Sequence, residues 1–97
     1  MATYIVNSLF VKGFDEEIQF DRAYLYVHKV GSTSWSLEIE EAEQSSIFRN
    51  AIRNREHLNI TFSAEYMKEL KGSVMVKRVT NDSVELKGSG ELVSFND

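Results

Sequence analysis

Apolar and polar side chains alternate over short runs of this sequence, and this two-residue period limits the fold more than any other feature does. The clearest run is residues 35–40, which read Trp-Ser-Leu-Glu-Ile-Glu, and the same period recurs in residues 58–63. A period of two is typical of a β-strand that buries one face and exposes the other to water. The sequence therefore predicts a fold built mainly from strands.

Longer extended runs flank these two segments. Residues 18–30 form one of them, and residues 84–94 form another, which contains Gly88 and Gly90. Paired glycines inside a strand often mark a sharp bend. The run 3–11 carries apolar groups on both faces, with Ile5, Leu9 and Val11 on one and Tyr4, Val6 and Phe10 on the other. We expect a mainly β, β-rich α+β fold: an antiparallel, strongly curved sheet forming a small barrel or a sandwich.

Two hairpins are predicted. In the first, Leu25 faces Ile39 and Val27 faces Leu37, so that the loop spans residues 30–34. In the second, a strand with Val74 and Val76 and a strand with Val84 and Leu86 flank the turn-rich residues 79–83. A two-residue loop there would place Lys77 against Leu86, whereas a three-residue loop over 80–82 pairs Val76 with Leu86 and Lys77 with Glu85. The three-residue loop is preferred because it buries no charge.

Helical spacing occurs in two places, so one or two short helices are predicted. Residues 45–54 carry apolar side chains three and four apart, with Ser45 or Ser46 available as the N-cap. Residues 64–71 follow Ser63 as a cap and precede Gly72, which is suited to a left-handed helix end. For residues 64–71 the alternative is a continued strand.

Length, net charge and cysteine content limit the number of domains and the classes of partner. The 97 residues suit one domain, 1–97, and the formal net charge of -4 leaves nucleic acid open only through a local basic patch. The chain has no Cys, which excludes disulfides and thiolate metal sites and favours a reducing compartment. No apolar run approaches membrane-spanning length, and no signal peptide is evident at the N-terminus, so we expect a cytoplasmic protein that does not contact a membrane.

An aromatic stripe is the first candidate binding feature. Tyr24, Tyr26 and His28 share one face of an extended run, and Tyr4 and Phe10 could lie near them on a neighbouring strand. Aromatic faces stack on bases, sugars or planar ligands. The alternative is that these side chains simply pack on a pleated surface, where aromatic residues are common.

A small basic group is the second candidate. It consists of Arg49, Arg53 and Arg55, near His57 and with Lys77 and Arg78 as further members if the fold brings them close. Such a group could meet phosphate or an acidic partner. The alternative is that the arginines balance the acidic residues before the predicted helix and its C-terminal dipole.

Residues for catalysis are few. The chain holds two histidines, His28 and His57, and its serines lie in no nucleophile-elbow pattern. No catalytic residue, metal ligand set or cofactor is predicted, and the acidic residues of positions 38–43 fit a solvated strand face.

Three functional hypotheses follow. The first is a non-catalytic protein-interaction or structural module, with a protein partner or a homodimer formed through an exposed strand edge. The second is a small-ligand or single-stranded nucleic-acid binding domain that uses Tyr24, Tyr26, His28, Arg49, Arg53 and Arg55. The third is an enzyme that pairs His28 or His57 with a carboxylate.

Overall fold

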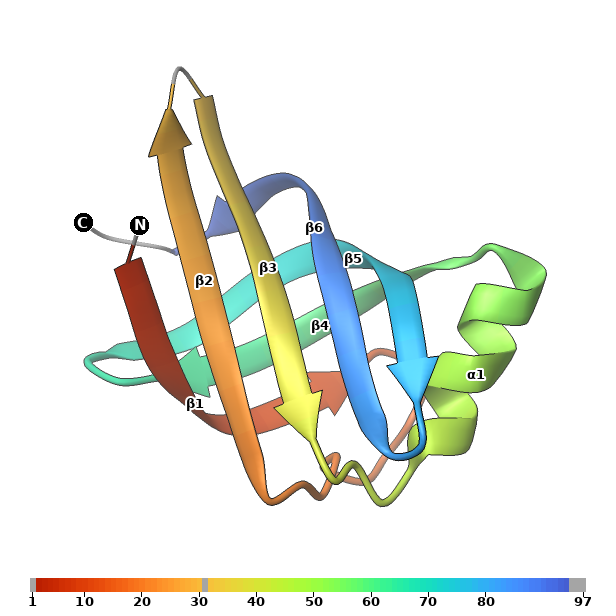
Figure 1. Ribbon diagram of the computed structural model, residues 1–97. Helices are drawn as coiled ribbons and strands as arrows, with labels where there is room; N and C mark the ends of the chain where they lie inside the picture. Colours follow the sequence, from red (N-terminus) through yellow and green to blue (C-terminus); the bar gives the residue numbers. More distant parts are fainter. Residues whose placement is uncertain (1, 31, 95–97) are drawn as a thin grey trace.

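The computed structural model describes residues 2–30 and 32–94. In these residues six antiparallel strands close into a barrel in the order β1-β2-β3-β6-β5-β4, and one helix packs beside it (Figure 1). The elements are β1 (Ala2–Val11), β2 (Arg22–Val30), β3 (Ser32–Glu40), α1 (Ser45–Asn54), β4 (His57–Ala64), β5 (Met67–Thr80) and β6 (Ser83–Val93). The predicted mainly β class and strongly curved sheet are confirmed, and of the two architectures the chain adopts the barrel.

The barrel consists of two crossed layers because several strands change neighbours along their length. Residues 2–5 of β1 pair with β2, whereas residues 6–11 pair with β4. β6 pairs with β3 only over residues 84–87 and continues along β5. In Figure 1, β2, β3 and β6 stand upright, and β4 runs across behind them.

The core lies between these layers and is built by the predicted alternation. Leu25, Leu37 and Ile39 are buried, and Trp35 keeps only 2% of its surface exposed. The Trp35 ring stacks on Phe62 with 6.1 Å between ring centroids. Burying a large apolar side chain is worth about 1.5–3 kcal/mol, so these inward residues supply most of the stabilisation.

The predicted faces of β1 are wrong. Val6 is buried together with Leu9 and Val11, while Ile5 is 51% exposed. The pairing with β4 shifts between Val6 and Ser8, which leaves Asn7 as an extra residue on β1. Because of this bulge, the side chains that point inward change from even-numbered to odd-numbered positions, and β1 bends away from β2 towards β4.

The first hairpin is tighter than predicted. Leu25 lies opposite Leu37 rather than Ile39, and the pairing continues to Val30 opposite Ser32. The predicted loop over 30–34 is therefore wrong, although residue 31 lies outside the described residues. A shift of two positions keeps every side chain on its face, so the buried set is as expected.

The second hairpin combines the two predicted registers. Thr80 pairs with Ser83, so the loop has two residues, and yet Val76 pairs with Leu86. A register shift after Val76 makes this possible because Lys77 is an extra residue on β5. The predicted pair of Lys77 with Glu85 is wrong, since Arg78 takes that place.

The predicted helix over residues 64–71 is wrong, and the alternative of a continued strand is closer. The chain makes a turn after Ala64, and β5 begins at Met67. Met67 and Leu70 are both buried although they are three residues apart. Glu69 takes a left-handed φ of 53° within the strand, and this bulge on β5 imitates a helical spacing. Gly72 lies inside β5 rather than at a helix end.

The helix over residues 45–54 is confirmed. Its N-cap is Gln44 without a side-chain cap, so neither Ser45 nor Ser46 plays the predicted role. Ser45 instead donates from Oγ to Asp82 Oδ1 at 3.2 Å. Phe48 is fully buried under the helix, which contacts β5.

Candidate functional site

The aromatic stripe lies on the outside of the barrel. Tyr24, Tyr26 and His28 face away from the core on β2, with the two tyrosines half-buried and His28 exposed. The tyrosine ring centroids are 6.4 Å apart, and the ring planes are tilted by 39°. As predicted, the three side chains share one face of the strand, and in the structure that face points away from the core.

Tyr26 is the most constrained member of the stripe. Its hydroxyl donates to Glu38 Oε2 at 3.4 Å, across the β2–β3 pairing. Burial first, and then the neighbouring charge of Glu38, raises the pKa of Tyr26 above its ordinary value. The phenol is therefore neutral near pH 7 and acts as a hydrogen-bond donor.

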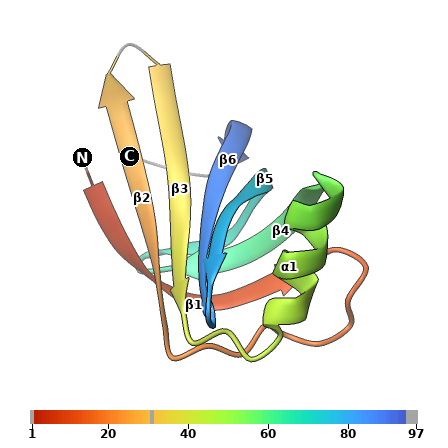
Figure 2. The same cartoon turned by 45° about the vertical axis from the view of Figure 1, so that its right-hand side comes forward.

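The arginines lie elsewhere. Figures 1 and 2 both place α1 and β2 on opposite sides, with β3 and β6 between them. Arg49 donates to Ser45 Oγ at 2.7 Å and to the carbonyl oxygen of Asn81, which ties the helix to the β5–β6 turn. Arg53 lies in the last helical turn, and Arg55 follows it as the left-handed C-cap. The structure does not bring the stripe and the arginines together.

The other basic residues separate as well. His57 begins β4, with Nδ1 3.4 Å from Ser89 Oγ. Arg78 approaches Glu85 at 4.0 Å. Lys77 alone among them lines the same groove as Tyr26 and His28.

That groove, which we call the β3 groove, has a volume of about 570 Å³ and lies on the outer face of β2, β3 and β6. Short side chains of β3, Ser34 and Ser36, lie between larger neighbours on the adjoining strands. The lining residues are Tyr26, His28, Ser34, Trp35, Ser36, Leu37, Glu38, Lys77, Glu85, Leu86 and Lys87.

The β3 groove meets a fork between two strands. β3 and β6 pair only from Ser36 opposite Lys87 to Ile39 opposite Val84. Beyond Ser36, β6 follows β5 and no described strand pairs with that edge of β3. β1 likewise pairs with β2 only as far as Val27. Within the described residues, the hairpin tip therefore projects with two unpaired edges, as Figure 1 shows at its top.

Trp35 explains why the two strands separate. A Cβ added at Gly88 would lie 2.2 Å from Trp35 Cε2, and one added at Gly72 would lie 2.5 Å from Cζ2. Only glycine allows the indole this close to β5 and β6. The indole Nε1–H donates to the carbonyl oxygen of Gly90 at 3.1 Å. Gly90 has a φ of +77°, so the predicted glycine bend is confirmed and has a packing cause.

Two other unpaired edges of the barrel are covered by described parts of the chain. β4 pairs with β5 only as far as Met75, and α1 packs against β5 beyond that point, over Val76. β1 leaves β2 after Ile5, and there the backbone N–H of Ile18 donates to the carbonyl oxygen of Leu9 at 2.9 Å. The fork beside β3 thus differs from both.

Two lysines in the β3 groove carry unbalanced charge. Of the two carboxylates that line the groove, Glu85 has Arg78 beside it, whereas Glu38 accepts a hydrogen bond from the neutral Tyr26 hydroxyl and keeps its charge. Neither the Lys77 side chain nor the Lys87 side chain has a hydrogen bond or ion pair within the part of the chain that the structure describes. Counted with Arg78, three cationic side chains (Lys77, Lys87 and Arg78) stand against two carboxylates (Glu38 and Glu85), so the local charge is +1.

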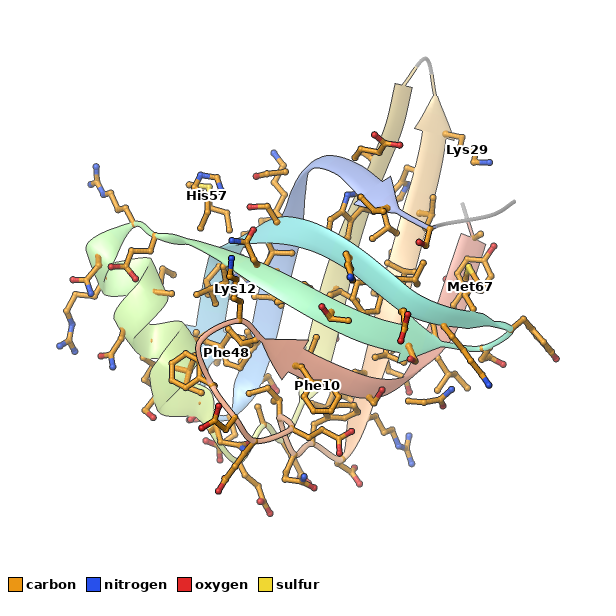
Figure 3. The ribbon with its side chains drawn as sticks, turned by 180° about the vertical axis from the view of Figure 1, so that it is seen from behind. Phe10, Lys12, Lys29, Phe48, His57 and Met67 are labelled. Carbon is orange, nitrogen blue, oxygen red and sulfur yellow. The ribbon has the colours of Figure 1, made fainter. Side chains whose placement is uncertain are left out.

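A second exposed surface was missed in the sequence. Phe10, Phe14 and Val93 are 43%, 46% and 49% exposed around a groove of about 780 Å³. Phe10 lies on the half of β1 that pairs with β4, so it is away from the aromatic stripe. Figure 3 shows Phe10 far from Lys29, which is near the hairpin tip. No local sequence signal unites Val93 with Phe10 and Phe14, because only the fold brings β6 beside the turn after β1.

Within residues 2–30 and 32–94, no group of three or more His, Cys, Asp or Glu side chains is placed to hold a metal ion. Over the same ranges, neither His28 nor His57 has a hydrogen bond to a carboxylate. No helix in these ranges is long and apolar enough to cross a membrane.

Comparisons with known proteins add no assignment. No family model matches this chain, no curated protein matches it, and no solved structure matches it. The function of the β3 groove is therefore inferred from its residues.

Proposed function

We propose that this protein is a non-catalytic interaction module that binds an extended segment of another protein at the β3 edge of the fork. The observation that carries the proposal is the contrast among strand edges. The edges near Leu9 and Val76 are covered by other parts of the chain, whereas the β3 edge beyond Ser36 has no described strand beside it. An uncovered edge is a template for an added strand.

Backbone hydrogen bonds alone would hold a bound segment weakly, so contacts with side chains must add to its binding free energy. A backbone hydrogen bond contributes about 0.5–1.5 kcal/mol net, so the few bonds that a short edge offers give weak binding alone. The β3 groove lies along the same edge and adds contacts with Tyr26 and His28. We therefore expect backbone pairing to set the direction of the bound segment and the groove to set its preference.

The ligand or nucleic-acid alternative has less support. Tyr24 and Tyr26 present tilted, half-buried rings rather than an open stacking surface. The arginines that would attract phosphate lie across the barrel. We propose a cytoplasmic setting for the interaction, on the ground of the Cys-free composition.

A peptide titration tests the proposal. The probes are three soluble peptides in which Val alternates with Ser, Glu or Lys, followed by amide NMR of the labelled protein. At least one probe should shift the amides of Ser34, Trp35 and Gly88 while leaving Leu9 and Val11 unchanged. N-methylation of alternate peptide nitrogens should abolish binding in one register only, because an edge uses every second N–H. If no probe shifts these amides, the proposal is wrong.

A further inference from the structure

We infer that the β3 groove selects acidic extended segments of a partner protein. This inference rests on the proposed function and names the chemistry of its partner. It is carried by the two lysines of the groove, Lys77 and Lys87, which converge from neighbouring strands on one volume.

Lys77 faces the groove because of a bulge. The pairing of β5 with β6 passes from Val76 opposite Leu86 to Arg78 opposite Glu85, so Lys77 is the residue without a partner. A bulge re-aims the side chain of its extra residue. Here Val76 stays in the core, Arg78 engages Glu85, and the ammonium of Lys77 remains for the groove.

Lys87 is unbalanced for a different reason. Its cross-strand neighbours are Ser36 on β3 and Met75 on β5. Neither neighbour carries a charge, so no carboxylate lies directly opposite this ammonium. Lys87 is also the last residue of β6 that pairs with β3, which places its charge at the base of the fork.

The acidic groups of the groove cancel these charges only in part, because Glu85 is paired with Arg78 and Glu38 alone opposes the two lysines. Glu38 accepts the Tyr26 hydrogen bond at 3.4 Å, and Glu85 lies 4.0 Å from Arg78. A carboxylate of a bound segment would therefore meet two free ammonium groups. Extended geometry suits this, because alternate side chains of an added strand project to the same outer face.

The overall charge of -4 does not oppose the inference. Five of the 15 acidic residues lie in two connections between elements: Asp15, Glu16, Glu17, Glu41 and Glu43. Figure 1 shows both connections at the end of the barrel away from the hairpin tip. Charges separated by more than about 8 Å are largely screened at physiological salt, so the local lysines decide.

The Ser-Val, Glu-Val and Lys-Val peptides separate this inference from the proposed function. In wild-type protein, the Glu-Val peptide should bind about fivefold or more tighter than the Lys-Val peptide, since each partly exposed pair adds modestly. Its affinity should fall as salt rises, whereas that of the uncharged Ser-Val peptide should stay constant. The K77E/K87E double variant should reverse the order of the two charged peptides.

A matched variant serves as the control. K68E/K71E makes the same charge change at two exposed lysines of β5 that do not line the β3 groove, and it should keep the wild-type order. If all three peptides bind at the fork with equal affinity, the inference is wrong and the proposed function stands. If none binds, both fail. The salt series uses wild-type protein, so it decides the matter even if the double variant does not fold.

Discussion

The two ends of the barrel differ in whether their unpaired strand edges are covered by other described parts of the chain. At the end that holds α1, the free edge of β5 lies under a helix whose Phe48 is fully buried. The nearby edge of β1 receives the buried residue Ile18 and its backbone hydrogen bond. At the hairpin-tip end, Trp35 is buried against Gly72 and Gly88, and the β3 edge beyond Ser36 remains beside no described strand.

This difference shows that burying the apolar core and covering the backbone edge of a strand are separate structural requirements. A helix does both, because it brings apolar side chains and also lies over the backbone. An indole held against two glycines fills the interior but leaves the backbone edge of its own strand free. Stability and edge availability should therefore respond to different substitutions, which the following variants test.

The largest effect is expected at the covered end. Phe48→Ala removes a fully buried aromatic side chain and should lower the free energy of unfolding by about 3–5 kcal/mol. Urea denaturation measures the loss. Hydrogen exchange should quicken at Val79 on β5 more than at Ser36 on β3, because the helix cover loosens first.

Ile52→Ala is the matched control on the same helix. Ile52 is 38% exposed, so its truncation should cost less than about 1.5 kcal/mol. Equal losses for the two variants would show that α1 does not act as an apolar cover.

The next effect is expected at the fork. In Gly88→Ala, the added Cβ would lie 2.2 Å from Trp35 Cε2, so the indole must move at a cost of about 1–3 kcal/mol. The emission of the single Trp should change together with the unfolding midpoint. Gly90→Ala is the control, because nothing lies within 4 Å of its Cβ and only its positive φ is strained. It should cost about 1 kcal/mol and leave the emission unchanged. An unchanged emission spectrum in both variants would contradict the close packing of the Trp35 indole against Gly88.

The sequence predicts the strands well, and its errors about which side chains face inward fall at bulges. Alternation assigns the inward side of β3 and the outward side of Tyr24 and Tyr26. It fails where one residue is inserted, at Asn7, Glu69 and Lys77, because the inward parity reverses there. These residues carry no local signal, since long-range pairing decides where a strand gains a residue. The predicted helix over 64–71 is the clearest consequence.

The candidate site was predictable only in part. Tyr26 and His28 follow from parity on β2. The fork does not, because it depends on Trp35 meeting Gly72 and Gly88, which lie far away in the sequence. The contribution of Lys77 depends on its bulge for the same reason.

A smaller effect should distinguish the arginines. Arg49→Ala removes the hydrogen bonds to Ser45 Oγ and to the Asn81 carbonyl, and it should destabilise the fold by about 1 kcal/mol. Arg53→Ala, on the same exposed side of the helix, should change stability by less than about 0.5 kcal/mol. Thermal unfolding of both variants measures the contrast. Equal shifts would mean that Arg49 does not fix the helix cover to the β5–β6 turn.

The smallest effect is expected at the β3 groove and depends on pH. Burial and the charge of Glu38 raise the pKa of Tyr26 in the folded protein, above the value of about 10 of an unfolded tyrosine. Below that pH the phenol is neutral in both states, and its contribution to stability is fully present. As the pH rises through the folded pKa, the unfolded chain has already released its proton and the contribution is lost.

Tyr26→Phe cannot ionise, so it should lose less stability than the wild type between about pH 9 and pH 11. The other tyrosines are common to both chains, and urea unfolding at each pH isolates the difference. Equal losses would show that Tyr26 titrates as a free phenol, and the groove wall would then be more hydrated than its burial indicates.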